Sequence, residues 1–310
     1  MSFSRDIADY PEGIVLAVDK PYRWTSADVI RKLKYAAIKR FGKKNLKVGH
    51  AGTLDPLATG VLLVCIGNAC KRAQELQDHD KEYIARIRFG ATTPSYDLEK
   101  EVDRQFPFSH ITADAVRAAL PAFLGEQEQV APLFSAKSVD GVRAYELARK
   151  LYRAGKTEAI DAAALETLHR NRITISELEL LDFTEDGIGV SEPSLRDPSH
   201  SQRASHGSGP LPLTRPRVAM GSDTPMPSSN NSASSRIHVA DTSALGLPEA
   251  TIRIACSKGT YIRAFARDLG ETLGSGAHLS GLIRSRSGEY RIESALSIED
   301  SLKLFSPPQD

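Results

Sequence analysis

Residues 48–67, VGHAGTLDPLATGVLLVCIG, constrain the fold more than any other part of this chain, because a polar loop runs directly into a continuous apolar strand. The glycines at 49, 52 and 60 permit positive φ or a close approach to a ligand, and Pro56 fixes its own φ. Asp55 is the one acidic residue here, so the loop can hold a single carboxylate in a preset direction. An Asp before Pro is also common in turns and at helix N-termini, so the dipeptide alone indicates structure.

Basic residues are concentrated just before this loop. The formal net charge of +1 does not indicate a nucleic-acid binder, but residues 31–47 contain eight Lys or Arg and no acidic residue. Such a run is often only the solvated face of a helix. Because this one leads directly into the Asp55 loop, we favour a surface that faces phosphates.

The three cysteines, Cys65, Cys70 and Cys256, form neither a disulfide framework nor a zinc-binding spacing, and are typical of a reducing compartment. The N-terminus lacks the basic-then-apolar order of a signal peptide, and no apolar run approaches the ~18 residues that a membrane span needs. We therefore expect a cytoplasmic protein without a metal site or a membrane segment.

Periodicity predicts alternating strands and helices. Residues 13–19, 81–89, 172–183 and 251–256 have the branched or alternating apolar pattern of strands. Thr25 or Ser26 can cap a helix whose apolar positions recur at i, i+4 up to residue 41, with Gly42 placed to end it.

The composition changes between residues 191 and 235. Nearly half of these residues are Ser, Pro or Gly, and none is aromatic. Such a segment buries too little apolar surface to offset its ordering entropy, so we predict a disordered insertion at about 188–248. A long surface loop costs little extra closure entropy, so the fold can tolerate it.

Two strings resemble the strongest motifs of the TruB family of tRNA pseudouridine synthases: GHAGTLDPLATGVL at 49–62 and CSKGTYIR at 256–263. The resemblance implies that Asp55 is the catalytic residue, that Arg263 pairs with it and that Tyr261 lies against it. In the string DKEY, Tyr83 matches the tyrosine that stacks on the target uracil. Considered alone, a tyrosine on the apolar face of a strand would be a core residue.

Weaker matches imply further site residues. Lys20 belongs to a Lys-Pro pair near the start of the sheet, and His50 matches a histidine that fills the gap left by the extruded base. Asp97 falls where the family has an acid that contacts the flipped nucleotide. Leu282 in HLSGLIRSRSGEY matches a leucine that packs beside the target base. Each of these residues, taken singly, is more often structural.

Residues 131–149 resemble another family segment, with one departure. The family lysine corresponds to Ser138, and Lys137 stands one residue earlier. Because a one-residue shift in a strand turns a side chain to the opposite face, the Lys137 amine is expected to point away from the usual side.

The resemblance implies an α+β pseudouridine synthase fold, with a mixed but mainly antiparallel central sheet flanked by helices. We expect one catalytic domain over residues 1–310, interrupted by the insertion and lacking the C-terminal PUA domain of many bacterial relatives. The implied activity is isomerisation of uridine 55 in the tRNA T-loop to pseudouridine by base flipping. The implied partner is tRNA, bound by a monomer without a protein partner.

The implied reaction breaks a glycosidic bond, rotates the uracil and forms a carbon–carbon bond. It is redox-neutral and hydrolyses nothing, so no cofactor or metal is expected, and the sequence shows no site for either. An aspartate is ionised at neutral pH, which suits a nucleophile at the sugar or a base that deprotonates it. A glycosidase would need two carboxylates flanking one bond, and the Asp55 loop has only one, so it does not favour a glycosidase.

Two other interpretations stay open: a guide-RNA-dependent rRNA pseudouridine synthase and a non-catalytic RNA chaperone. Guide-dependent synthases depend on the PUA domain, which this chain is expected to lack. A chaperone has no use for an ion pair between Asp55 and Arg263, because such a pair is costly to desolvate. Candidates for contacts with RNA phosphates are the basic run and four arginines: Arg86, Arg88, Arg284 and Arg286.

Overall fold

The computed structural model describes residues 2–135, 138–139, 142–157, 159–167, 170–186 and 237–307. They belong to one compact unit, which comprises Met1–Gly189 and Ala233–Asp310. None of the helices in these ranges is long and apolar enough to cross a membrane.

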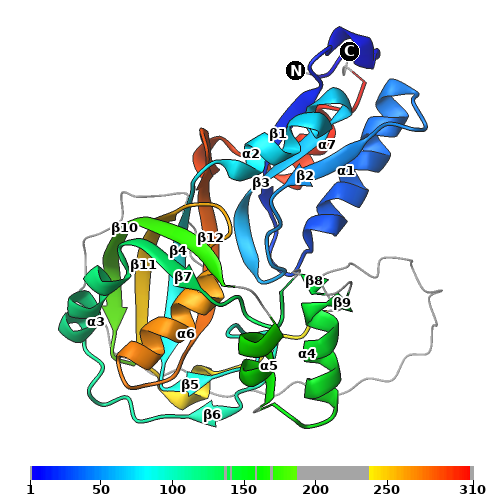
Figure 1. Ribbon diagram of the computed structural model, residues 1–310. Helices are drawn as coiled ribbons and strands as arrows, with labels where there is room; N and C mark the ends of the chain where they lie inside the picture. Colours follow the sequence, from blue (N-terminus) through cyan, green and yellow to red (C-terminus); the bar gives the residue numbers. More distant parts are fainter. Residues whose placement is uncertain are drawn as a thin grey trace, which may run out of the picture. The chain divides into compact units, whose positions relative to one another are not determined.

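A nine-stranded sheet organises the described residues (Figure 1). Its main path is β1 (Ile14–Lys20), β3 (Ala58–Ile66), β12 (Ala277–Ser287), β4 (Lys81–Phe89), β11 (Glu249–Cys256), β10 (Asn171–Thr184) and β7 (Gly125–Gln129). Strand β2 (Val48–Ala51) pairs with β3, and β13 (Tyr290–Arg291) pairs with β12. Only the β12–β3 pair is parallel among these strands, which confirms the predicted mixed, mainly antiparallel sheet.

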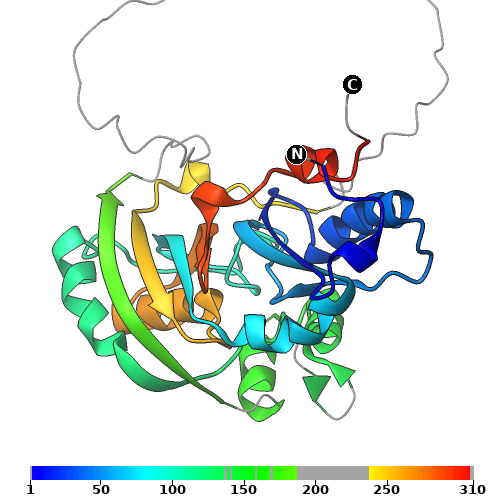
Figure 2. The ribbon, with the colours of Figure 1, turned by 90° about the horizontal axis from the view of Figure 1, so that it is seen from above.

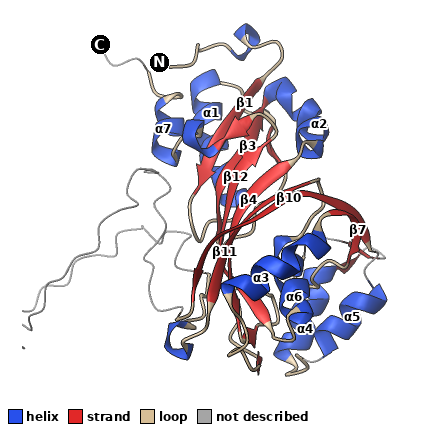
Figure 3. Ribbon diagram, turned by 90° about the vertical axis from the view of Figure 1, so that its left-hand side faces the viewer, coloured by secondary structure: helices blue, strands red, loops and turns tan. Residues whose placement is uncertain are grey.

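Helices flank both ends of this sheet. Figure 3 shows α1 (Ser26–Phe41), α2 (Ala73–Asp78) and α7 (Ile298–Lys303) around β1 and β3. The other helices are α3 (Ala113–Ala119), α4 (Ala144–Arg153), α5 (Ala159–Thr167) and α6 (Ile262–Thr272), and they lie at the β11–β7 end. Short 3-10 helices span Ile7–Asp9, Gly67–Arg72, Leu120–Phe123, Ser243–Leu245 and Ile292–Ser294. Two small hairpins complete the fold: β5 (Ala91–Thr92) with β6 (Arg104–Gln105), and β8 (Ser138–Val139) with β9 (Val142–Arg143).

Helix α1 follows from its local sequence. Thr25 and Asp28 form a capping box, and Gly42 ends the helix at φ 63° in the left-handed region that favours glycine. The apolar positions at i, i+4 spacing are buried, as predicted, and the basic residues take the opposite side. The Ser26 hydroxyl donates to the Leu54 carbonyl and accepts from the Leu54 N–H, both at 3.0 Å. The helix N-terminus is thereby fastened to the loop that contains Asp55.

Strand β4 lies between β12 and β11, and its apolar face is buried at every second residue, as the alternation predicted. Tyr83, Ala85, Ile87 and Phe89 all join the main core. The central strand thus places Tyr83 beside β12, opposite Arg284.

The predicted insertion falls only partly within the described residues. Residues 187–236 lie outside them, whereas 237–248 pack on the fold (Figure 2, yellow). Ala240 and Thr242 are buried, and the 3-10 helix Ser243–Leu245 follows.

A buried histidine makes the stability of this sheet sensitive to pH. His278 of β12 is fully buried, and its Nδ1 lies 2.8 Å from the Ala91 carbonyl, which requires a proton on Nδ1. Burial lowers the pKa of His278 to about 4. Because an unfolded histidine titrates near 6.5, the neutral side chain contributes fully to the free energy of unfolding above pH 6.5, and about 3 kcal/mol of that free energy is lost as the pH falls towards 4.

We expect His278→Asn, which keeps a donor, to flatten the fall of the unfolding free energy between pH 6.5 and 4. The exposed His110→Asn variant serves as the control, and equal slopes in all three proteins would contradict the assignment.

Candidate active site

The loop that holds Asp55 joins β2 to β3, and a buried arginine donates hydrogen bonds to its backbone. Arg284 of β12 is 1% exposed and donates to the carbonyls of Val61 (2.6 Å), Thr53 (3.3 Å) and Gly52 (3.3 Å). Gly60 has φ 98°, and a Cβ there would lie 2.3 Å from the Arg284 carbonyl oxygen. Glycine is therefore required where the two strands meet.

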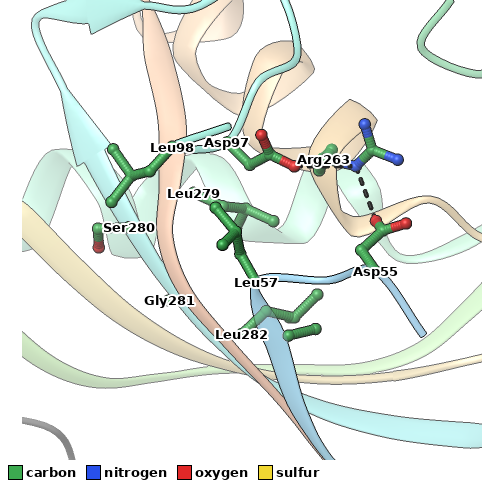
Figure 4. A pocket seen from close by; sticks show the side chains of 10 residues that line it. Asp55, Leu57, Asp97, Leu98, Arg263, Leu279, Ser280, Gly281 and Leu282 are labelled. Carbon is green, nitrogen blue, oxygen red and sulfur yellow. Dashed lines mark hydrogen bonds and ion pairs between the residues drawn. The ribbon is translucent and has the colours of Figure 1, made fainter. Parts of the chain in front are cut away.

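Asp55 and Arg263 form the ion pair that the resemblance implied (Figure 4). Arg263 stands in the first turn of α6, and its Nε donates to Asp55 Oδ2 at 2.8 Å. A second nitrogen, Nη1, donates to the Ser95 carbonyl at 3.2 Å. The Arg263 side chain is only 7% exposed, whereas that of Asp55 is 38% exposed. The guanidinium thus fixes one side of the carboxylate and leaves the other accessible.

Asp97 is a second acid close to the same guanidinium. Its Oδ2 is 3.6 Å from Arg263 Nε, and its Oδ1 accepts from the Ser95 hydroxyl (2.6 Å) and the Glu99 N–H (2.9 Å). Burial raises the pKa of Asp97, and Arg263 opposes that rise. Burial and the Asp97 charge raise the pKa of Glu99 to about 7.

The positive charge of Arg263 is stabilised by these acids. Burial alone would lower the pKa of Arg263, but the charges of Asp55, Asp97 and Glu99 outweigh burial and raise it. Arg263 therefore remains a cation in a site that excludes most water.

A small, partly open pocket lies beside the ion pair. One wall is Leu57 and Ala58, at the start of β3, and another is Asp97 and Leu98. The floor comes from β12, where Leu282 lies opposite Ala58 in the parallel pair. The complete lining is Asp55, Leu57, Ala58, Asp97, Leu98, Arg263, Leu279, Ser280, Gly281 and Leu282. Four of the predicted site residues, Asp55, Asp97, Arg263 and Leu282, therefore meet here.

Tyr83, Tyr261 and His50 are not among the residues that line this pocket. Tyr83 is 8% exposed, and burial raises its pKa, so the phenol stays protonated. Tyr261 caps α6, and its backbone exchanges hydrogen bonds of 2.8 and 3.2 Å with the Gln129 amide. His50 lies in β2, where burial and the charge of Arg284 lower its pKa and favour a neutral imidazole.

Lys20 is fully buried, so its ammonium group faces the protein rather than the pocket. Its Nζ donates to the carbonyls of Trp24 (2.6 Å), Pro21 (3.0 Å) and Pro56 (3.2 Å), which match the three donors of an ammonium group. Burial lowers the pKa of Lys20 to about 7, against the opposing charge of Asp55. This geometry assigns Lys20 to holding the residue after Asp55, rather than to direct contact with a ligand.

We expect Lys20→Met to destabilise the protein, because it removes the three hydrogen bonds of a buried ammonium group. The Pro21 and Pro56 carbonyls keep the N–H groups of Trp24 and Arg23 as donors, so the loss falls mainly on the Trp24 carbonyl, at about 1–3 kcal/mol for an acceptor that water does not reach. Chemical denaturation measures the loss. The exposed Lys303→Met variant on α7 removes a lysine that only pairs with Asp300 and should change the free energy of unfolding by much less. An equally small effect of Lys20→Met would contradict the assignment.

All four candidate phosphate-binding arginines make hydrogen bonds within the protein, including Arg286, whose Nη1 donates to the Gly288 carbonyl at 3.3 Å. Arg284 braces the Asp55 loop, while Arg86 and Arg88 bind Glu249 at 2.6 and 2.7 Å from their Nε atoms. Glu249 also accepts from the Ser280 hydroxyl at 2.6 Å. The expectation of phosphate contacts is wrong for Arg284, which is enclosed, whereas for Arg86 and Arg88, whose side chains are partly exposed, and for Arg286 it stays a prediction.

The predicted departure at Lys137 lies outside the described residues, and Ser138 is placed only as a backbone partner of Arg143 in the β8–β9 hairpin. In the described part of the chain, no group of three or more His, Cys, Asp or Glu residues could hold a metal ion. Sequence reasoning missed Gln129 and Glu249, whose partners are distant in the chain, and Glu99, which is buried beside its neighbour Asp97.

Comparisons with known proteins agree with this geometry. Residues 39–191 match the sequence model of the TruB family pseudouridylate synthase (N terminal domain). The chain is 43% identical to tRNA pseudouridine synthase B of Phocaeicola vulgatus over 94% of this chain and 92% of that protein. It is 37% identical to the protein of that name from Flavobacterium johnsoniae, over 95% and 98% of the two chains. For the Thermus thermophilus protein the identity is 39%, over 92% of this chain and 76% of that one.

Solved structures show the same fold at lower identity. A chain in the crystal structure of a Cbf5–Nop10–Gar1 complex superposes with a TM-score of 0.54 at 20% identity. The superposition covers 97% of this chain and 58% of the other. A chain of an H/ACA RNP bound to a substrate RNA that contains 2'-deoxyuridine gives a TM-score of 0.52 at 18% identity, over 97% and 57% of the two chains.

Proposed function

The chain belongs to the TruB family of pseudouridylate synthases, and on this premise we propose that it isomerises uridine 55 in the T-loop of tRNA to pseudouridine. The observation that carries the proposal is the half-exposed carboxylate of Asp55, held by the buried Arg263 at the edge of a small pocket. We further propose that it acts as a monomer in the cytoplasm, in a single catalytic domain that the segment around 188–236 interrupts.

The reaction needs one carboxylate that is ionised when the substrate binds. The glycosidic bond breaks, the uracil rotates and a carbon–carbon bond forms at the same sugar carbon, so nothing is hydrolysed. Asp55 acts at the sugar, either as the nucleophile or as the base that removes a proton. Arg263 holds this carboxylate in a fixed orientation. Asp97 is turned towards Ser95 and the Glu99 N–H, and in this proposal it supports Arg263 and contacts the nucleotide.

The target base must leave its stack before Asp55 can reach the sugar, at a cost of a few kcal/mol. Stacking on Tyr83 would return about 1–3 kcal/mol. That role requires the ring of Tyr83, which is now 8% exposed, to become more accessible when RNA binds. Leu282 in the pocket floor packs beside the base, and the neutral His50 fills the gap that the base leaves.

Incubation of the purified chain with an unmodified tRNA transcript, followed by pseudouridine mapping, tests this function. We expect product at position 55 without any added protein or guide RNA. Product that forms only with an added guide would support the guide-dependent alternative, and RNA binding without product would support the chaperone.

The basic side of α1 and the turn after it should bind the RNA backbone. Lys34, Lys44 and Lys47 border an open hollow that continues to Gly49, next to the Asp55 loop. We expect the affinity for tRNA to fall steeply with salt, and Lys34→Gln with Lys44→Gln to reduce the log–log slope by about 1 for each phosphate that a lysine no longer neutralises. Lys303→Gln on α7 is the control. A slope that is unchanged in the double variant would remove this surface from the RNA interface.

A further inference from the structure

Residues that the proposed mechanism does not use pack against the outer side of two pocket walls, those of Leu57 and Leu98. Leu57 and Leu98 line the pocket and form a small apolar cluster with the buried Ala240. Ile237 and Val239 pack against the same cluster. We call residues 237–242 the strap; it lies immediately after the segment that the structure does not describe.

Arg23 connects the strap to the loop of Asp55. The Arg23 Nη2 donates to the Ile237 carbonyl at 2.5 Å. The backbone N–H of the same residue donates to the Pro56 carbonyl at 3.0 Å. Arg23 has φ 61°, a left-handed conformation that is uncommon for residues other than glycine. One residue in an unusual conformation therefore joins the strap to the neighbour of Asp55.

The strap is also tied to the opposite wall. The Ala240 N–H donates to the Leu98 carbonyl at 2.8 Å, and His238 Nε2 lies 2.6 Å from Glu101 Oε1. At its end, the buried Thr242 accepts from Arg88 Nη1 at 2.8 Å. Arg88 in turn binds Glu249, which holds Ser280 in the pocket floor.

We propose that the strap and Arg23 form an outer clasp that sets the distance between the Asp55 loop and the Asp97–Leu98 wall. Arg263 joins the same two walls from inside, through Asp55 and the Ser95 carbonyl. The clasp rests on the proposed function, since it positions Asp55 for that reaction. Arg23 is in this account a positioning residue, and the strap supports the pocket walls from outside without lining the pocket.

The test separates the Arg23 side chain from its backbone. Asn tolerates a left-handed φ, so Arg23→Asn keeps the N–H bond to Pro56 and removes only the guanidinium contact with Ile237. Because small displacements of a reacting group are costly, we expect kcat on tRNA to fall by about 10- to 100-fold, with KM nearly unchanged. Arg23→Lys keeps one charged donor and should restore part of kcat.

A second variant disturbs the clasp from the strap. Ala240→Leu overpacks a position that is 3% exposed and should lift the strap from Leu98, with the same loss of kcat. The exposed Arg117→Asn variant on α3 is the control and should match the wild type. All assays are run well below the unfolding midpoint of the least stable variant, so that a folding defect is not read as a loss of kcat.

The outcomes distinguish this proposal from the proposed function. A wild-type protein that forms no pseudouridine overturns the function itself. An active wild type with unchanged kcat in both Arg23→Asn and Ala240→Leu overturns the clasp. A higher KM with unchanged kcat in Arg23→Asn also overturns it, because Arg23 would then contact RNA instead of positioning Asp55.

Discussion

Asp55→Asn is expected to bind tRNA as the wild type does and to lose turnover by at least about 100-fold, within the 10²–10⁴ range of positioned acid–base groups. Asn has nearly the same shape and can still accept from Arg263 Nε, which now lies 2.8 Å from Asp55 Oδ2. It carries no negative charge, so it can neither attack the sugar nor deprotonate it. Asp55 is 38% exposed but is one of the acids that stabilise the buried Arg263, so the neutral variant should lose some stability, and its activity is measured well below its unfolding midpoint.

Single-turnover formation of pseudouridine and tRNA affinity, measured at the same salt concentration, check this prediction. Asp114→Asn, an exposed surface substitution on α3, is the matched control. Activity of Asp55→Asn above a hundredth of wild type would count strongly against Asp55 as the catalytic residue. Loss of tRNA binding would instead show that the carboxylate supports the shape of the pocket.

Local patterns predicted the elements whose residues interact with near neighbours. The N-cap of α1 at Thr25, the i, i+4 spacing of its apolar residues and the alternation of β4 are all present as predicted. The pairing of Asp55 with Arg263 joins residues 208 positions apart, and no periodicity could reveal it. Only the resemblance of two separate motifs to one family predicted this pair.

Residue type did not predict that two basic residues, Lys20 and Arg284, are buried. Lys20 and Arg284 look like surface residues because charged groups are costly to bury. Both are fully enclosed, and backbone carbonyls of the Asp55 loop supply their partners. Those carbonyls become available only once the loop has folded, so residue type carries no sign of them.

The fixed position of the strap could not be predicted from its own sequence either. Its sequence, IHVADT, follows a Ser- and Pro-rich stretch and has no strong periodicity. Its order comes from Leu57, Leu98 and Arg23, which are more than 100 residues away in the chain. Composition shows where a segment has few apolar side chains of its own. A short segment of this kind can still pack in a fixed position against apolar residues from another part of the chain.

Arg263→Lys is expected to reduce kcat by about 100-fold although it keeps the charge. Arg263 makes two directed contacts from a planar fork, with Asp55 Oδ2 (2.8 Å) and the Ser95 carbonyl (3.2 Å), and lies 3.6 Å from Asp97. A shorter ammonium group cannot reach these acceptors in the same geometry. Removing one charged hydrogen bond costs about 1.5–3 kcal/mol, and about 2.7 kcal/mol corresponds to 100-fold.

Arg253→Lys is the matched control, because Arg253 also binds one carboxylate through two nitrogens, with Glu179 at 3.0 and 2.6 Å. That pair is exposed and remote from the pocket, so its substitution should leave kcat within the error of the assay. Comparable kcat in wild type and Arg263→Lys would mean that Asp55 needs only a nearby positive charge. A selective loss in Arg263→Lys would show that the orientation of the carboxylate, and not its charge state alone, limits the reaction.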